Sequence, residues 1–218
     1  MTVDKTVALA DIDAGLADAE PHLTASEQRL AVTVYRLLAT GESVTAQAAA
    51  TTTGTSAADV ERVLHAWPSV YFDDQDRIIG FWGLALRPMP HRLRRGDVDL
   101  FAWCAWDPLF LALIIGAIDV ATDDPVTGDT ITYQVGPHGT ISGLSHPESV
   151  LSFLRREQPW DDQIMATFCH YILQFVGSES ARRWTANHPD TFIISLDDAL
   201  HLGRRHVTRS FGATLADM

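Results

Sequence analysis

The sequence predicts an α+β protein, in which an N-terminal three-helix, winged-helix-like module packs on a mixed β-sheet domain with flanking helices. Two observations carry this prediction. Apolar residues recur with helical spacing up to about residue 66, and after Pro68 they alternate with a period of two. The 218 residues, 46% of them hydrophobic and 20% charged, can bury a sizeable core without disulfides.

Three short helices are expected in the N-terminal module. The first begins at a capping box in residues 24–27 and ends near Gly41, where a glycine is the preferred C-terminal cap. The second helix covers residues 45–52 and the third covers residues 56–66. We expect residues 1–20 to form an N-terminal arm or a short helix ahead of them.

A β-hairpin follows these helices, with strands at residues 70–72 and 78–82 and an acidic turn at residues 73–76. Three helices followed by a hairpin resemble a winged helix, a fold that either binds DNA or serves as a packing module. The favoured interpretation is packing, because Arg62 is the only lysine or arginine in the second and third helices. The predicted module spans residues 21–86.

Strands and helices are mixed in the α+β catalytic domain predicted for residues 87–218. A stretch rich in proline and arginine lies within residues 83–96 and marks the boundary. The expected elements are strands at residues 98–103, 130–135, 139–144, 165–176 and 191–194, and helices after Pro108, at Ser178 and at Ser195.

Charge and cysteine content limit the partners and the compartment. The formal net charge is −12, and only one of the sixteen basic residues, Lys5, is a lysine, so we expect no nucleic-acid partner. Two cysteines do not make a disulfide framework, and the first ten residues do not resemble a signal peptide. The expected location is therefore the cytoplasm.

One apolar stretch is nearly long enough to cross a bilayer. Residues 100–118 contain a single charged side chain, Asp107, which Pro108 follows directly. A carboxylate near the middle of a span would cost roughly 2.5–3.5 kcal/mol on insertion. We therefore interpret the stretch as a buried core segment and expect no membrane association.

The same stretch contains the first candidate for chemistry. Asp followed by Pro is a helix-start signal, so Asp107 alone would be a helix cap. Cys104 lies three residues earlier, either just before the helix, where the helix dipole lowers a thiol pKa, or one turn from Asp107 on the same face. A lone cysteine in this position would be interpreted as a small buried apolar residue.

The second cysteine changes that interpretation. In the predicted strand, a period of two places Cys169 on the inward face with Tyr171, and His170 on the opposite face. Two thiols and the Asp107 carboxylate in one apolar pocket would form a site for a soft ion such as Hg(II) or Cu(I). A zinc site is poorly supported, because no paired C-x-x-C or H-x-x-x-H spacing exists.

Three stretches of the chain resemble the organomercurial lyases, the alkylmercury lyase family. They are "IIG" with "GLAL" in residues 78–86, "LFAWCAWDPLFLALIIG" in residues 100–116 and "FCH" in residues 168–170. The resemblance runs from about residue 23 to residue 211. It implies a winged-helix-like module packed on a mixed sheet domain, and the cleavage of carbon–mercury bonds.

The resemblance also implies the roles of particular residues. The family's catalytic residues, two cysteines and an aspartate that also bind the mercury, fall on Cys104, Asp107 and Cys169. In the implied reaction a thiolate attacks the mercury, a proton moves through the aspartate to the carbon, and Hg(II) stays on the two thiols. Trp103 and Phe168 match aromatic positions of the family and are either substrate-pocket residues or core packing.

The resemblance implies no organic cofactor, external thiols for product release, a small organomercurial as substrate and a mercuric reductase as candidate acceptor of Hg(II). The chain departs from many family members in lacking a further cysteine in residues 121–125. Three alternatives stay open: a non-catalytic Hg or Cu binding protein, a relative recruited to other thiol chemistry, and a winged-helix regulator.

Overall fold

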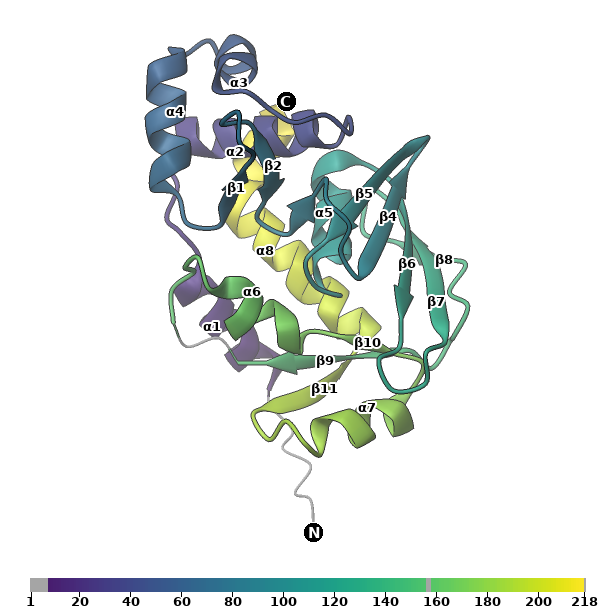
Figure 1. Cartoon of the computed structure of the whole chain (residues 1–218). Coiled ribbons are helices and arrows are strands. Elements are labelled where there is room, and N and C mark those ends of the chain that lie inside the picture. Colours follow the sequence, from purple (N-terminus) through teal and green to yellow (C-terminus); the bar gives the residue numbers. More distant parts are fainter. Residues whose placement is uncertain (1–7, 156–157, 218) are drawn as a thin grey trace.

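The computed structural model describes residues 8–155 and 158–217, and it has the predicted α+β architecture (Figure 1). The strands form an eight-stranded sheet and a three-stranded sheet, and the long helix α8 packs against α1, α2 and α5. In chain order the elements are α1 (Leu9–Ala19), α2 (Ala25–Leu38), α3 (Ala46–Thr53), α4 (Ala57–Ala66), β1 (Val70–Phe72), β2 (Ile78–Phe81), β3 (Leu84–Ala85), β4 (His91–Arg95), β5 (Val98–Ala102), α5 (Asp107–Ile115), β6 (Ile118–Asp123), β7 (Thr130–Val135), β8 (Ile141–Ser142), β9 (Val150–Leu154), α6 (Ile164–Thr167), the 3-10 turn η1 (Cys169–Tyr171), β10 (Gln174–Phe175), α7 (Ser178–Thr185), β11 (Thr191–Ser195) and α8 (Leu196–Asp217).

The three predicted helices of the N-terminal module are α2, α3 and α4, and each begins at a side-chain cap. At α2 the Thr24 hydroxyl accepts from the Glu27 amide at 3.3 Å, and the Glu27 carboxylate accepts from the Thr24 amide at 2.8 Å. At α3 and α4 the Thr45 and Ser56 hydroxyls accept from the amides of Ala48 and Asp59, without a reciprocal bond. These local signals explain why the helices could be predicted from sequence.

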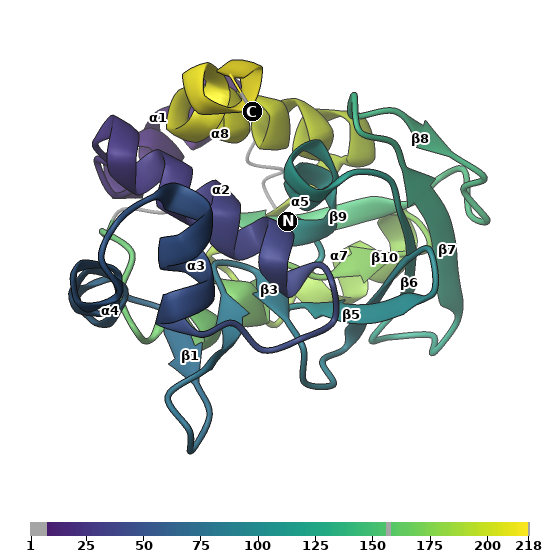
Figure 2. The same ribbon diagram turned by 90° about the horizontal axis from the view of Figure 1, so that it is seen from above.

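The segment predicted as an arm or short helix contains α1, which packs along α8 on one side of the molecule (Figure 2). Ile12 and Leu16 are fully buried. Polar contacts reinforce the packing, since the Arg209 guanidinium on α8 donates to the Asp13 carboxylate at 3.0 Å and to the Glu20 carboxylate at 2.8 Å. Residues 9–20 are therefore an integral part of the fold.

The large sheet joins the N-terminal module to the rest of the chain. Its order is β1-β2-β3-β5-β4-β6-β7-β8, and every neighbouring pair is antiparallel. Strand β3 pairs with β5, with Leu84 opposite Ala102. The β1–β2 hairpin is therefore joined through β3 to β5, the strand that precedes the first cysteine, in one sheet.

Helix α5 lies at the centre of the molecule, between α8 and the large sheet (Figures 1 and 2). Its residues are buried on nearly all sides, with Leu109, Leu111 and Ala112 at 0% exposure. This burial accounts for the long apolar stretch in the sequence. Across residues 8–155 and 158–217, no helix combines the length and apolarity that a membrane crossing requires.

Two strand predictions are wrong. Residues 165–176 form the end of α6, the turn η1 and only a two-residue strand, β10. The reason is that Ile164 and Phe168, four residues apart, are both buried on one face of a helical turn. The strand predicted at residues 139–144 is reduced to β8, since Gly139 and Gly143 both adopt positive φ. The sequence analysis did not predict strands β3, β4, β6 and β9.

Candidate functional site

The segment between β5 and α5 brings Cys104 and Asp107 together. Trp106 is the N-cap of α5, and Asp107 is its first residue, followed by Pro108. The Asp107 side chain turns back, and its Oδ2 accepts from the backbone amide of Cys104 at 2.7 Å. The expectation that Asp107 caps the helix is therefore wrong, because its carboxylate serves the turn that holds the cysteine.

Burial sets the protonation behaviour of Asp107. The residue is 5% exposed, and its pKa is raised to about 7, mainly by burial. Hydrogen bonds from the backbone and the thiol of Cys104 oppose the rise in pKa. A carboxyl group with a pKa near neutrality can both accept and release a proton at physiological pH.

The two free thiols lie next to each other, although no pattern in the sequence showed that they meet. The Cys104 thiol hydrogen-bonds the side chains of Cys169 and Asp107. The backbone amide of Ala105 donates to the carbonyl of Ile172 at 3.0 Å, which ties the two cysteine-bearing segments together. Cys169 thus reaches the site from the 3-10 turn η1, whereas we had expected a strand.

The pKa of Cys104 differs from the sequence expectation. Burial raises the pKa of the Cys104 thiol well above its usual value, and the hydrogen bond with Cys169 and the charge of Asp107 raise it further. A position just before a helix predicted a lowered pKa. That expectation is wrong, because Cys104 has no exposed surface and loses the solvation of its charged form.

An apolar cavity opens beside these residues, with an empty volume of about 660 Å³ counting the space at its mouth. Asp107 and Cys169 line it, and so do the two predicted pocket residues, Trp103 and Phe168. Cys104 is not among the lining residues and lies behind Cys169. A ligand in the cavity therefore meets one sulfur and the carboxyl before it meets the second sulfur.

Part of the cavity wall comes from residues that the sequence did not single out. Tyr35 on α2 and the turn residues Trp82 and Gly83 belong to the N-terminal module, and Trp106 and Phe110 belong to the α5 region. The adjacent Trp-Gly pair between two short strands was the available signal, since a glycine there predicts a hairpin turn. Nothing in the sequence placed that turn beside the cysteines.

At another part of the wall, three polar residues from α1 and α8 satisfy one another. Glu20 accepts from His206 Nδ1 at 2.7 Å and from the Ser210 hydroxyl at 3.0 Å, besides its bonds from Arg209. Burial would raise the pKa of Glu20, but His206 and Arg209 outweigh it and hold that pKa at about 2. The Glu20 carboxylate therefore stays ionised and paired, and its bonds are a structural contact between the two helices.

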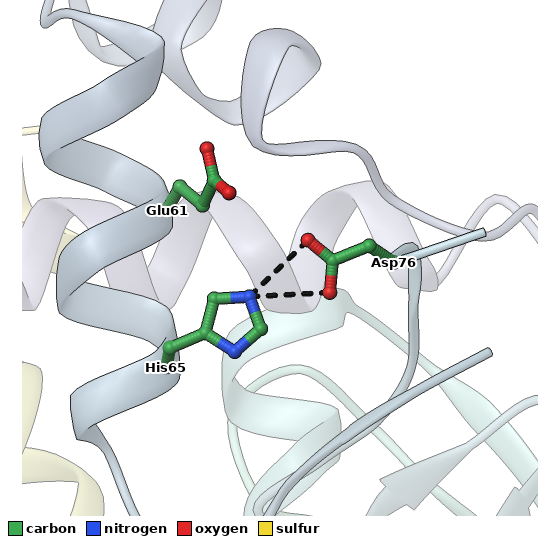
Figure 3. Close-up of side chains that lie close together, drawn as sticks. All are labelled: Glu61, His65 and Asp76. Atoms are coloured by element: carbon green, nitrogen blue, oxygen red, sulfur yellow. Dashed lines mark hydrogen bonds and ion pairs between the residues drawn. The ribbon is translucent and has the colours of Figure 1, made fainter. Parts of the chain in front are cut away.

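A second group of potential metal ligands is exposed on the far side of the N-terminal module (Figure 3). Glu61 and His65 lie one turn apart on α4, and Asp76 lies in the β1–β2 turn. His65 Nε2 is 3.1 Å from Asp76 Oδ1, and the His65 ring stacks on Phe72 with centroids 4.3 Å apart. These nitrogen and oxygen donors join the turn to α4 and provide none of the sulfur that a soft ion prefers.

Comparisons with known proteins agree with this geometry. A family model described as alkylmercury lyase matches residues 84–208, and a model described as the helix-turn-helix domain of alkylmercury lyase matches residues 11–82. The chain is 35% identical over 170 residues to the alkylmercury lyase of Bacillus cereus, which covers 78% of this chain and 76% of that protein. The same enzyme of Pseudomonas putida is 32% identical over 164 residues, 75% of this chain and 76% of that protein.

A solved structure titled "Crystal structure of the mercury-bound form of MerB2" shares the fold. The TM-score is 0.70, the alignment covers 93% of this chain and 98% of that chain, and the sequence identity is 23%. The family models together span both halves of the chain, and the curated relatives exceed 30% identity over most of it. The chain therefore belongs to the alkylmercury lyase family, and its activity is the cleavage of carbon–mercury bonds.

Proposed function

We propose that Cys104, Asp107 and Cys169 carry out this cleavage by protonolysis, giving a hydrocarbon and Hg(II) held on the two cysteines. The observation that carries the proposal is the hydrogen-bonded cluster of these three side chains at the wall of an apolar cavity. Thiolate sulfur is the preferred ligand of Hg(II), and the nearby carboxyl group can carry a proton.

The substrate first meets Cys169, the cysteine that lines the cavity. In this step the sulfur of Cys169 bonds to the mercury of R–Hg–X, X leaves as an anion, and the thiol proton leaves with it. The product of the step is R–Hg–S, with the organic group still on the mercury. Capture by the thiol that lines the cavity places the mercury beside the enclosed sulfur of Cys104.

The second step moves the proton of Cys104 to the carbon. Asp107 takes the thiol proton, the resulting Cys104 thiolate bonds to mercury, and Asp107 gives the proton to the carbon as the carbon–mercury bond breaks. The hydrocarbon R–H leaves, and Hg(II) has two sulfur ligands. Asp107 ends as a carboxylate, so the proton on the hydrocarbon is the one that Cys104 lost. The pKa of about 7 supports transfer in both directions.

The cavity supports the reaction by its apolarity. We propose that Trp103 and Phe168 contact the organic group, since each adjoins a cysteine and lines the cavity. Apolar walls exclude water, which strengthens the interaction between the carboxyl group and the reacting thiol.

The proposed cycle needs no organic cofactor. Two solution thiols exchange onto the mercury and return both cysteines to the free state, which requires a reducing compartment such as the cytoplasm. A mercuric reductase is the proposed acceptor of the released Hg(II), because Hg(II) bound to small thiols is readily passed on by further thiol exchange.

Single-turnover release of benzene from phenylmercury tests the proposal. We expect release by the wild-type protein, and at least a thousandfold slower release by Cys104→Ser, Cys169→Ser and Asp107→Asn, because each variant removes a group that reacts in the cycle. Asp119→Asn changes a carboxylate on the exposed side of β6 and serves as the control that retains full activity. Stoichiometric Hg(II) binding without benzene release would instead identify a soft-metal binding protein.

A further inference from the structure

The hairpin turn between β2 and β3 lies directly against Asp107. Phe81 pairs with Leu84, so Trp82 and Gly83 form a two-residue turn. A Cβ placed on Gly83 would lie 2.8 Å from both Cγ and Oδ1 of Asp107. Since real Cβ atoms do not approach other atoms so closely, the carboxyl group packs on the bare α-carbon of Gly83. The turn is thus one wall of the position that Asp107 occupies.

This turn has a strained backbone. Trp82 has φ of 37° and Gly83 has φ of 97°. Two-residue hairpin turns with positive φ at both positions favour Asn-Gly, and a bulky side chain at the first position is disfavoured by about 1–3 kcal/mol. Such an unfavourable conformation persists only when surrounding contacts hold it in place.

Three contacts hold Trp82 in this conformation. The buried hydroxyl of Tyr35 donates to the Trp82 carbonyl at 2.8 Å, and the Trp82 indole donates to the carbonyl of Pro68 at 2.9 Å. The indole also stacks on Phe81, with centroids 4.4 Å apart. Of these contacts, the Tyr35 bond is the one that fixes the peptide group between Trp82 and Gly83.

The same peptide region contacts the catalytic segment a second time. The backbone amide of Trp103 donates to the Gly83 carbonyl at 3.1 Å, one residue before Cys104. Gly83 therefore contacts the segment on both sides of Cys104, by a hydrogen bond to Trp103 and by packing on Asp107. A rotation of the peptide before Gly83 would move both contacts.

We propose that Tyr35 is a positioning residue for Asp107, acting through the Trp82–Gly83 turn. The Tyr35 hydroxyl keeps the turn in the conformation in which Gly83 packs on the carboxyl group of Asp107. This packing holds Asp107 next to Cys104. Tyr35 thus serves the proton-transfer step and has no part in holding mercury on sulfur. The inference rests on the proposed role of Asp107 in proton transfer.

Tyr35→Phe tests the proposal, because it removes only the hydroxyl. With full-length protein and phenylmercury, we expect the single-turnover rate of benzene release at saturating substrate to fall about tenfold, because the turn can then relax away from the carboxyl group. The KM for phenylmercury and the affinity for Hg(II) in competition with a solution thiol should stay within twofold of wild type. Asp119→Asn is again the control with an unchanged rate, since its side chain lies on the exposed side of β6.

Gly83→Ala is the second variant and decides the question if Tyr35→Phe does not fold. It should lower the rate by more than tenfold with the same unchanged Hg(II) affinity, because its Cβ meets the carboxyl group directly. A wild-type rate in the folded variants, or a parallel loss of Hg(II) affinity, would overturn the positioning role. An active Asp107→Asn enzyme would instead overturn the proposed function on which this inference rests.

Discussion

Asp107 is the residue at which function and stability oppose each other. Its carboxyl group is enclosed by Gly83 on one side and Cys104 on the other, and burial raises its pKa to about 7 from an ordinary value of 3.8. The folded state therefore binds a proton that the unfolded state releases between these two pH values. Keeping the carboxyl group poised for proton transfer lowers the stability of the native state above neutral pH.

Asp107→Asn should show this cost directly. The folded pKa is the higher one, so the wild-type protein loses stability as pH rises from 3.8 to about 7 and stays at the lower level above that. An amide does not titrate, so the variant should gain about 4 kcal/mol relative to wild type between pH 3.5 and pH 8. Urea unfolding of both proteins across this range measures the difference, and a constant difference would contradict the assigned pKa.

At the scale of residues, the sequence indicated the cysteine pair, the aspartate and the adjoining aromatic residues Trp103 and Phe168, but not the residues that the N-terminal module adds to the site. Cys104 and Asp107 are close in sequence, so their proximity could be predicted. Tyr35 and Gly83 reach Asp107 only through the tertiary fold, and no local pattern encodes that approach. The raised pKa of Cys104 also depends on complete burial, which the helix-dipole argument did not include.

At the scale of elements, ion pairs join the α1 segment to α8. Asp13 and Glu20 on the α1 side have 12% and 6% of their side chains exposed, and Arg209 binds both. The loss of one member of a buried group leaves the opposite charge without compensation, which is costly in a poorly solvated site. The N-terminal segment should therefore depend on this arginine for its attachment.

Arg209→Ala should lower the free energy of unfolding by about 2–3 kcal/mol, because Glu20 then retains only His206 and Ser210 as partners. The control is Arg62→Ala, which removes an ion pair whose side chains are 72% and 67% exposed and should therefore have a much smaller effect on the free energy of unfolding. Chemical denaturation of the two variants makes the comparison. Equal effects would show that the α1–α8 contact is held by apolar packing alone.

Elements with local signals could be predicted, and elements defined by their neighbours could not. Helices α2, α3 and α4 each begin after a threonine or serine cap that can be recognised in the sequence. Strand β4 (His91–Arg95) contains three arginines and forms a strand because it pairs with β5 on one side and β6 on the other. Residues 165–176 have an apolar alternation typical of a strand, but tertiary packing makes half of them helical and leaves a strand only at β10.

For the whole molecule, the charge distribution argues against a role for the winged-helix-like module in DNA binding. The net charge is −12, and α3 and α4 together contain a single arginine, Arg62, beside Asp59 and Glu61. We expect no binding of duplex DNA even at low salt, because too few cations are available to displace the counterions of the phosphates. Fluorescence anisotropy with a labelled duplex tests this, and salt-dependent binding would contradict it.

The shared eight-stranded sheet limits how this protein can be divided. The two family models meet at residues 82 and 84, on either side of Gly83, within a turn whose strands belong to one continuous sheet. Separation there would remove β2 from β3 and leave both strand edges unpaired, and exposed strand edges promote aggregation. Recombination that replaced one half of the gene with an unrelated sequence would break this sheet, so it would be selected against. The two halves should therefore be inherited together.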